Sequence, residues 1–285
     1  MPETAMAPLD RAEVEARIGA TDEPFALLSG GLANRNVRVG RDRVLKIYRD
    51  ASRIGKERAL LSRAWRSFRT PKVLDAGGDF LVLEWVEHAA LADSDAHGAA
   101  VGRALAEIHE KRYAVTGVLG ADLEIARAFP GDGHDGLTPR GYGGACLADA
   151  APFVDPALRA RIESFLAREP LAGRDAVDVP LLSHCDFKAS NLHWTPCGEL
   201  LVLDWEFAWA GTRYIDIGQL LRWQPPEPFV RAFADAYVAG GGALFDDWRR
   251  FAELLDLGSL LGLYRNPAAR SSDDVLRRIE AIIAR

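Results

Sequence analysis

Cysteine is scarce in this sequence, and its pattern excludes two kinds of stabilised domain. The chain of 285 residues contains three cysteines, Cys146, Cys185 and Cys197, and no two of them form a C-x-x-C pair. An odd number of cysteines without such a pair indicates neither a disulfide framework nor a zinc site. We therefore expect reduced thiols, as in a protein of a reducing compartment.

Long hydrophobic runs are also lacking. No apolar stretch approaches the roughly 20 residues that a membrane-spanning helix needs. Residues 1–20 carry four acidic side chains, and they lack the basic start and the apolar centre of a signal peptide. The sequence therefore predicts a cytoplasmic protein that has no membrane partner.

An excess of positive charge is also lacking. The formal net charge is −6, whereas proteins that bind nucleic acid usually carry a basic face. We therefore expect no nucleic-acid partner. The remaining composition, with 48% hydrophobic and 27% charged residues, is typical of a globular protein, and 285 residues suffice for two lobes that each have a core.

The predicted secondary structure changes in kind along the chain. The first part is rich in short strands around turn signals and contains one helix, whereas the later part is mostly helical. We expect strands at 25–29, 36–39, 43–49, 80–86 and 200–203, helices at 54–65, 95–111, 156–168 and over most of 216–285, breaks at 225–226 and 240–242, and a glycine-rich loop at 131–144. This pattern predicts an α+β fold with a small N-terminal lobe of antiparallel sheet and one helix, residues 1–86, a larger and mostly helical lobe, residues 87–285, and a hinge at about 84–91.

One segment carries the strongest chemical signal. Asp186 stands five residues before Asn191, and the apolar run that follows ends at a second acid, Asp204. The residues between Asn191 and Asp204 read as a hairpin, which would bring its two ends together. Carboxylate and amide oxygens are suitable ligands for magnesium beside phosphates. The alternative is a capped turn followed by an unrelated acid at the end of a strand.

Three motifs resemble those of the aminoglycoside phosphotransferase and choline kinase family. The segment from His184 to Asn191 is similar to the catalytic loop of that family, and Leu203-Asp204-Trp205-Glu206 is similar to its metal-binding motif. The segment from Leu28 to Asn36 resembles the nucleotide loop of the choline and thiamine kinase branch. The resemblance extends from about residue 25 to residue 220. It implies a bilobal, protein-kinase-like fold that binds ATP or GTP in the cleft.

The resemblance also implies roles for residues of the second lobe. Asp186 would be the catalytic base, and Asn191 and Asp204 would be ligands of Mg²⁺. Lys188 would offset charge on the transferred phosphoryl group, with a solvated surface lysine as the alternative. His184 and Asp216 would support the catalytic loop without taking part in the chemistry.

The pattern of the first lobe predicts a buried ion pair. Val44 and Lys46 share one face of their strand, since side chains alternate there. Glu57 lies on the apolar stripe of the following helix, where a lone charge is costly. Lys46 is the expected partner, and the pair would direct Lys46 to the α- and β-phosphates, with Val44 against the adenine. The alternative is a surface pair between Glu57 and Arg53.

Two further nucleotide contacts are expected. Gly30 and Gly31 stand between two predicted strands, where the missing side chains would let the backbone approach a phosphate. The resemblance places the hinge, with Glu84 and Val86, against the adenine.

The acceptor is the least determined part of the site. The loop 131–144 and the helices after Asp216 should line its pocket. Glu206, Tyr142, Trp209 and Trp223 are the candidates, and an acidic and aromatic pocket would suit a cationic acceptor such as an aminoglycoside, choline or thiamine. A sugar or a nucleoside could also fit. The oligomeric state is not indicated.

Two other functions compete with that of a small-molecule kinase. A protein kinase is opposed by Cys185, where an arginine is expected, and by the short stretch between Asp204 and Asp216. A non-catalytic nucleotide-binding module usually lacks a base, a metal ligand or the phosphate lysine, and all three are present here.

Overall fold

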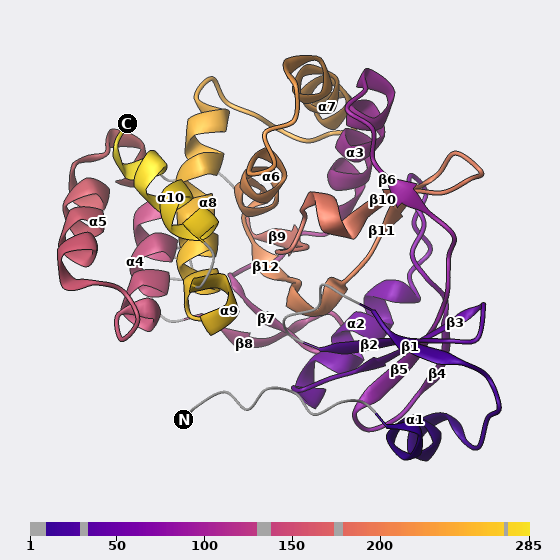
Figure 1. The fold of residues 1–285 in the computed structure, drawn as a ribbon. Coiled ribbons are helices and arrows are strands. Elements are labelled where there is room, and N and C mark those ends of the chain that lie inside the picture. Colours follow the sequence, from indigo (N-terminus) through magenta and orange to yellow (C-terminus); the bar gives the residue numbers. More distant parts are fainter. Residues whose placement is uncertain (1–9, 29–33, 130–137, 174–178, 271–272) are drawn as a thin grey trace.

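The fold was analysed in a computed structural model that describes residues 10–28, 34–129, 138–173, 179–270 and 273–285. Figure 1 shows a small sheet with two helices beside a larger and mostly helical part. The structure is therefore α+β and bilobal, as the sequence predicts.

The smaller part is built on one antiparallel sheet of five strands. Its order is β1-β2-β3-β5-β4, so β3 is the central strand and places Lys46 between Asn36 and Leu81. The turn before β3 has Gly40 at a φ of +60°. The strands are β1 (Phe25–Leu27), β2 (Arg35–Val39), β3 (Arg43–Ile47), β4 (Val73–Ala76) and β5 (Phe80–Glu84).

The two faces of this sheet have different partners. Helix α1 (Arg11–Ile18) covers one face, where Val14 packs with Leu45, Ile47 and Val82 in a small core. Side chains on the opposite face, including Tyr48 and Leu81 and Leu83 of β5, belong to the main core of the protein instead. The alternation predicted for the strand around Lys46 is therefore confirmed.

The predicted helix after β3 is shorter than expected. Helix α2 spans Ile54–Leu61, so Trp65 lies beyond its end. Trp65 is nevertheless partly buried, because its ring packs against those of Phe68 and Trp205, at centroid distances of 4.8 Å and 5.2 Å. The place of Trp65 is therefore decided by tertiary contacts.

The larger part consists mainly of helices. The expected breaks near 225 and 240 separate three of them, and α3 packs against α7 (Figure 1). The helices are α3 (Asp95–Ile108), α4 (Pro139–Ala150), α5 (Pro156–Arg168), α6 (Arg213–Leu221), α7 (Glu227–Ala239), α8 (Trp248–Tyr264), α9 (Pro267–Arg270) and α10 (Asp273–Ile283).

Short strands form two further sheets, and apart from the hairpin at 191–204 the sequence did not predict them. One has the order β11-β10-β6, and the other has the order β8-β7-β12-β9. Most are three residues long and pair with distant segments, so periodicity could not detect them. The strands are β6 (Ala89–Ala90), β7 (Gly117–Leu119), β8 (Ile125–Ala128), β9 (Leu181–Ser183), β10 (Leu192–Trp194), β11 (Leu200–Val202) and β12 (Trp209–Gly211). The predicted hairpin is confirmed, since β10 pairs with β11.

The expected loop at 131–144 needs a correction, because helix α4 begins at Pro139. The side chain of Thr138 accepts a hydrogen bond from the Gly141 N–H, and proline at the first helical position fits its fixed φ. Three glycines of this helix suggested a loop. Tertiary packing outweighs their low helix propensity, since the Tyr142 ring lies directly against Gly258 of α8.

The predicted division at residue 86 stays a prediction, although two features agree with it. Strand β5 ends at Glu84, and β6 already pairs with β10 of the larger part. The connecting residues 85–88 lie between these two sheets.

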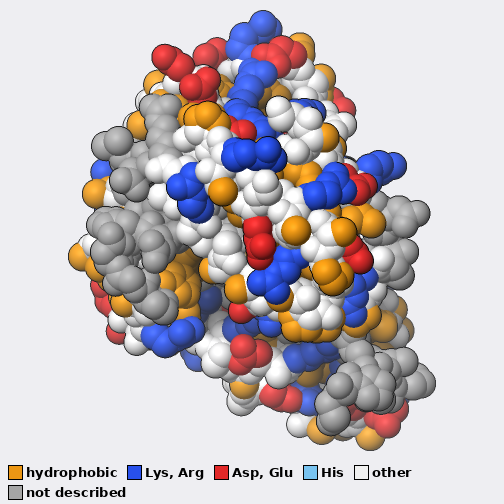
Figure 2. All heavy atoms as spheres, turned by 90° about the vertical axis from the view of Figure 1, so that its left-hand side faces the viewer, with side chains coloured by type: hydrophobic (Ala, Val, Ile, Leu, Met, Phe, Trp, Pro, Cys, Tyr) orange, Lys and Arg blue, Asp and Glu red, His pale blue; other side chains and the backbone are white. Residues whose placement is uncertain are grey.

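Charged side chains of both signs cover the face formed by the helices on the left of Figure 1. Figure 2 shows basic, acidic and hydrophobic groups interspersed over this face. The helices on this side carry ion pairs such as Arg159–Glu163 and Arg161–Glu280. Among the described residues, no helix combines the length and hydrophobicity needed to cross a bilayer.

The docking of α1 can be tested at Val14, whose side chain is fully buried. Val14→Ala should lower the free energy of unfolding by about 1–3 kcal/mol, because it removes buried methyl groups and leaves a void. Val238→Ala is the matched control, since Val238 is 51% exposed on α7, and it should change stability by less than about 0.5 kcal/mol. Urea denaturation measures both, and equal effects would contradict the role of Val14.

Candidate active site

A cavity of ≈ 760 Å³ lies between the five-stranded sheet and the helical part. Val44 and Lys46 of β3 line it from one side, and Asp186 and Asn191 line it from the other. Its wall therefore brings together residues that are widely separated in the sequence.

The Lys46 ammonium is held between two carboxylates. Its Nζ donates to both oxygens of Glu57, at 2.8 Å and 2.9 Å, and to Asp204 Oδ1 at 2.6 Å. The Tyr48 hydroxyl donates to Glu57 Oε2 at 2.6 Å. The predicted ion pair is thus present, and the alternative partner Arg53 bonds to Asp50 and Glu206 instead.

The electrostatics of this cluster keep Lys46 and Asp204 charged. Burial pushes the pKa of Lys46 down, but Glu57 and Asp204 outweigh this effect and raise the pKa above its ordinary value. Burial likewise raises the pKa of Asp204, but Lys46, together with weaker contributions from His184 and Lys188, outweighs this effect, so the net pKa of Asp204 is lowered. Asp204 is about one-third exposed, at 32%, which leaves it open to the cavity.

Helix α2 is tied to the segment that follows Asp204. Glu57 accepts a hydrogen bond from the Trp205 N–H at 3.3 Å, and Lys56 donates to the Ala208 carbonyl at 2.6 Å. Burial lowers the pKa of Lys56. Lys56 and Glu57, which are adjacent on α2, therefore attach this helix to both ends of the short 3₁₀ helix Trp205–Phe207.

Asp186 has a partner on each carboxylate oxygen. Lys188 Nζ lies 2.7 Å from Oδ1, and Asn191 Nδ2 donates to Oδ2 at 2.7 Å and to the Asp186 carbonyl at 2.9 Å. Lys188 is 35% exposed. The carboxylate is thus oriented from both sides and still faces the cavity.

Helix α6 supports the backbone of this loop. Asp216 is fully buried and accepts from the N–H groups of His184 and Cys185, at 2.9 Å and 2.7 Å. His109 Nε2 lies 3.1 Å from the same carboxylate. Cys185 adopts a φ of +61°, a left-handed conformation that is unfavourable without glycine, and these bonds help to hold it.

His184 links the loop to the hairpin in its neutral form. Its Nδ1 accepts from the Asp186 N–H at 3.2 Å, so Nε2 carries the proton and donates to the Leu203 carbonyl at 3.0 Å. Burial lowers the pKa of His184, and the neighbouring aspartates only oppose that shift. The geometry thus makes His184 a structural link between the loop and the residue before Asp204.

Asn191 and Asp204 meet at the base of the hairpin. The Leu203 N–H donates to the Asn191 carbonyl at 2.9 Å. The Asn191 amide nitrogen faces two oxygens of Asp186 that only accept, so its Oδ1 points the other way. The amide oxygen and the Asp204 carboxylate form a hard-oxygen donor set that fits Mg²⁺, with the remaining ligands left to phosphates and water. The described residues hold no cluster of three or more His, Cys, Asp or Glu that could bind a metal unaided.

The residues expected around the nucleobase lie on the cavity wall. Val44, Glu84 and Val86 all line the cavity. The Glu84 carboxylate itself pairs with Arg69 at 2.6 Å. Gly30 and Gly31 lie outside the described residues.

The residues expected to bind the acceptor are separated by the structure. Tyr142 and Glu206 line the cavity, but Glu206 is buried, and its carboxylate lies 3.4 Å from Arg53. Burial raises the pKa of Glu206. Trp209 and Trp223 are not among the described residues that line the cavity. Trp209 packs between Phe129 and Tyr142, and Trp223 packs on Phe229.

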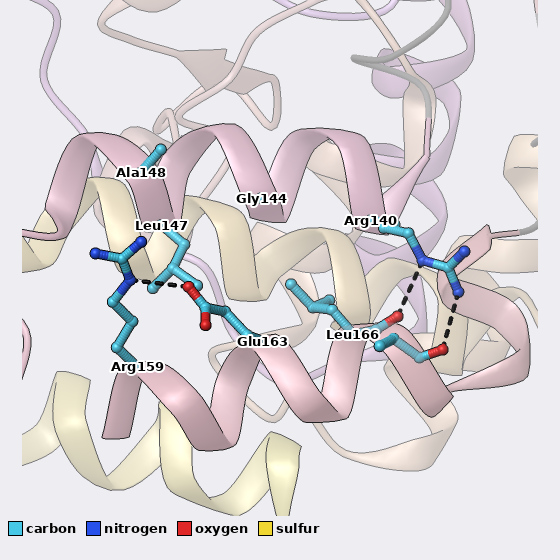
Figure 3. A pocket seen from close by; sticks show the side chains of 8 residues that line it. Arg140, Gly144, Leu147, Ala148, Arg159, Glu163 and Leu166 are labelled. Atoms are coloured by element: carbon cyan, nitrogen blue, oxygen red, sulfur yellow. Dashed lines mark hydrogen bonds and ion pairs between the residues drawn. The ribbon is translucent and has the colours of Figure 1, made fainter. Parts of the chain in front are cut away.

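A smaller hollow of ≈ 260 Å³ lies between α4 and α5 (Figure 3). Its charged groups are engaged with each other or with the backbone. Arg159 donates to Glu163 at 2.8 Å, and Arg140 donates to the Leu166 carbonyl at 3.1 Å. None of the individually predicted site residues lines the hollow, although Arg140 and Gly144 belong to the segment 131–144 that was expected to line the acceptor pocket.

The comparisons with known proteins decide the family. The model of the phosphotransferase enzyme family matches residues 25–254. The chain belongs to the phosphotransferase enzyme family. A search of curated proteins finds no significant match.

Solved structures of low sequence identity share the fold of this phosphotransferase. The macrolide 2′-phosphotransferase of Brachybacterium faecium is 19% identical, with a TM-score of 0.64 over 95% of this chain and 96% of that one. An ADP-bound aminoglycoside phosphotransferase, APH(2″)-Ib, is 18% identical, with a TM-score of 0.62 over 96% and 97%. A putative fructosamine-3-kinase of Thermobifida fusca is 21% identical, with a TM-score of 0.57 over 93% and 98%. The chain is thus an enzyme of the phosphotransferase family with a kinase-like bilobal fold.

Sequence reasoning missed several residues that shape the site of this phosphotransferase. Gln219 accepts from the Phe187 N–H at 2.8 Å and donates to the Cys185 carbonyl at 2.9 Å, so it binds the catalytic loop beside Asp216. Arg222 lines the cavity. Helical spacing could have identified Gln219, because it follows Asp216 by three residues and therefore neighbours it on α6. No sequence pattern marked Lys56.

The neutral state of His184 predicts how the stability of the metal-free phosphotransferase depends on pH. The folded pKa lies below the ordinary value of 6.5, so below about pH 6.5 the unfolded chain takes up a proton that the folded one excludes. Stability should fall by about 1.4 kcal/mol per pH unit from this group as the pH decreases toward the folded pKa. Urea denaturation between pH 5.5 and 7.5 should show a shallower slope for His184→Gln. An unchanged slope would contradict the assignment.

Proposed function

We propose that this phosphotransferase transfers the γ-phosphate of ATP or GTP, bound with Mg²⁺, to a hydroxyl group of a small molecule. The observation that carries the proposal is the meeting of Lys46, Asp186, Asn191 and Asp204 in one cavity. Phosphoryl transfer requires a phosphate-binding cation, a base and hard oxygen ligands within reach of one another.

The nucleotide would occupy the side of the cavity formed by the sheet. Val44, Glu84 and Val86 would contact the nucleobase there. Lys46 would bind the α- and β-phosphates, with Glu57 holding the ammonium in place. Gly30 and Gly31 are proposed to cover the phosphates.

Asp186 is proposed to accept the proton of the attacking hydroxyl. The hydroxyl oxygen then forms a bond to the γ-phosphorus, the bond between that phosphorus and the bridging oxygen breaks, and the nucleoside diphosphate leaves. Lys188 would turn from Asp186 toward the γ-phosphate and offset its charge. Bound between Asn191, Asp204 and the phosphates, Mg²⁺ would neutralise charge on the β- and γ-phosphates.

His184 and Asp216 would act through position only. Asp216 holds the loop backbone, and His184 joins it to the hairpin that carries Asp204. Neither side chain lines the cavity, so we propose that neither exchanges a proton with the substrate.

The geometry favours a small acceptor over a protein substrate. The turn Trp205–Phe207, β12 and the start of α6 account for the chain from Asp204 to Asp216. No long segment remains there to dock a peptide or to be switched by phosphorylation. The non-catalytic alternative is tested directly by turnover, since a binding module would leave ATP intact with every acceptor.

The base is tested by Asp186→Asn, which should lower kcat by about 10²–10⁴-fold, because the hydroxyl loses its proton acceptor. Affinity for magnesium nucleotide should change little, since Asp186 faces the acceptor. Coupled release of ADP or GDP with an accepted substrate measures kcat, and calorimetry measures binding. Asp235→Asn, at an exposed position of α7, is the control. An undiminished kcat in Asp186→Asn would remove the assignment.

The metal ligand is tested by Asp204→Asn. Removing the charged ligand should weaken binding of magnesium nucleotide by about 10-fold or more. The affinity for nucleotide in the presence of EDTA should change less, because only the metal loses its ligand. Calorimetry with and without Mg²⁺ separates the two effects. Equal losses under both conditions would show that Asp204 acts through Lys46 alone.

A further inference from the structure

The cavity has a second end, away from the sheet, that is lined by three helices. We define this acceptor end by Tyr142 of α4, Gln219 and Arg222 at the end of α6, and Ser259, Leu263 and Asn266 on and after α8. Asp186 lies on the same cavity wall. A molecule whose hydroxyl is to reach Asp186 would therefore contact these side chains.

The carboxylates that line the cavity already have cationic partners. Glu57 and Asp204 share Lys46, and Glu84 pairs with Arg69. Glu206 lies beside Arg53, and Asp186 beside Lys188. Among the described lining residues, no carboxylate is left to attract a cationic acceptor, so the basis of the cationic class predicted from sequence is weak.

Arg222 is the one charged side chain of the acceptor end as defined above. Its Nε donates to both oxygens of Asp256, at 3.1 Å and 2.9 Å, and its Nη2 donates to Asp256 Oδ1. Asp256 is only 5% exposed and Arg222 is 15% exposed. The carboxylate thus takes one edge of the guanidinium, while Nη1 has hydrogen-bond donors on the other edge.

Helix geometry places Arg222 beside the catalytic loop. Gln219 and Arg222 are three residues apart and so lie next to each other at the end of α6. Gln219 binds the backbone of the loop that carries Asp186. Arg222 lies beside it and lines the cavity.

Close packing of α6 on α8 fixes the position of Asp256 relative to Arg222. A Cβ at Gly218 would lie 2.3 Å from the Ala252 carbonyl oxygen and 3.0 Å from the Asp256 Cβ. Only glycine permits this approach, which brings Asp256 within reach of Arg222. Burial alone would lower the pKa of Arg222, but Asp256, and more weakly Asp186 and Tyr142, raise it, so the guanidinium stays charged.

We propose that Arg222 binds a carboxylate group of the acceptor, which makes the substrate a small hydroxylated acid whose hydroxyl faces Asp186. The inference rests on the proposed function, and it gives that function a substrate class. A guanidinium that is held from behind by Asp256 presents oriented N–H donors, and such donors match the planar geometry of a carboxylate.

A carboxylate suits this site better than a phosphate group. Asp256 already neutralises much of the charge of Arg222, and no second described cation lines the acceptor end. A phosphate dianion would place more negative charge beside Asp186 than one partly neutralised arginine can offset. Tyr142, Ser259 and Asn266 would supply uncharged hydrogen-bonding groups for the other oxygens of the acceptor.

The test compares acceptors that share a carbon skeleton. Glycerol, glycerate and glycerol 3-phosphate form one set, glucose and gluconate form a second, and kanamycin represents cationic acceptors. The purified full-length protein should show a higher kcat/KM for the carboxylated member of each set. The readout is the ratio of kcat/KM for the carboxylated acceptor to that for the neutral one.

Variants of Arg222 should lower this ratio. Arg222→Gln should decrease it by about 10- to 100-fold, mainly through KM, because a charge-assisted hydrogen bond is lost. Arg222→Lys should restore only part of it, since one ammonium cannot bind Asp256 and the acceptor in the same way. Arg249→Gln, at an exposed arginine paired with Glu227, is the matched control and should keep the wild-type ratio.

A merely structural Arg222 would lower activity toward both members of a set and leave their ratio unchanged, and this result would overturn the proposal. Asp256→Asn keeps an oxygen acceptor for Nε but lets the guanidinium turn, so it should lower the ratio by a smaller factor. If Arg222→Gln does not fold, Asp256→Asn still tests the proposal through the same ratio.

Other results separate the acceptor class from the proposed function. Preference for the neutral member, for kanamycin or for glycerol 3-phosphate would overturn the carboxylate class and leave the kinase activity standing. Binding of magnesium ATP without turnover of any carboxylated acceptor would also count against the class. Failure to bind magnesium nucleotide at all would instead refute the function on which the class rests.

Discussion

The Lys46 ammonium between Glu57 and Asp204 is the interaction on which the rest of the site depends. It joins the central strand of the sheet, helix α2 and the end of the hairpin. A buried charge that loses its partner is strongly unfavourable. The helix therefore cannot move away from the sheet without exposing or orphaning Lys46. Lys56 and the Trp205 N–H tie the same helix to the segment after Asp204, so three elements are held in one geometry.

Helix α6 provides the second constraint. Asp216 and Gln219 bind three backbone N–H groups of the catalytic loop, including that of Cys185 at its positive φ. Such a backbone would be costly without fixed acceptors. Because Gln219 and Arg222 at the end of the same helix also line the cavity, the element that shapes the loop reaches the acceptor end as well. The position of the base and the binding of the acceptor are therefore linked through one helix.

The short connection after Asp204 distinguishes this arrangement from that of a switched kinase. Its residues form a 3₁₀ turn and strand β12, which pairs with β7 and β9. Asp204, whose backbone has a φ of +66°, is thus held by regular structure on both sides. A site built in this way is assembled before a substrate arrives, and this agrees with an enzyme that acts on small molecules without an ordering step.

The sequence by itself determined the fold class, the hairpin and the pairing of Lys46 with Glu57, because strand alternation, helical spacing and the cost of a lone buried charge all act over short distances. It did not determine the three-residue strands outside the hairpin, the start of α4 or the end of α2, which depend on distant partners such as Gly258 and Trp205. At the acceptor end, Tyr142 was expected from the sequence, whereas Arg222 was found only in the tertiary structure. Whether a charge is open to a substrate depends on which neighbour has already paired with it, and for Glu206 and Arg222 that neighbour is far away in the chain.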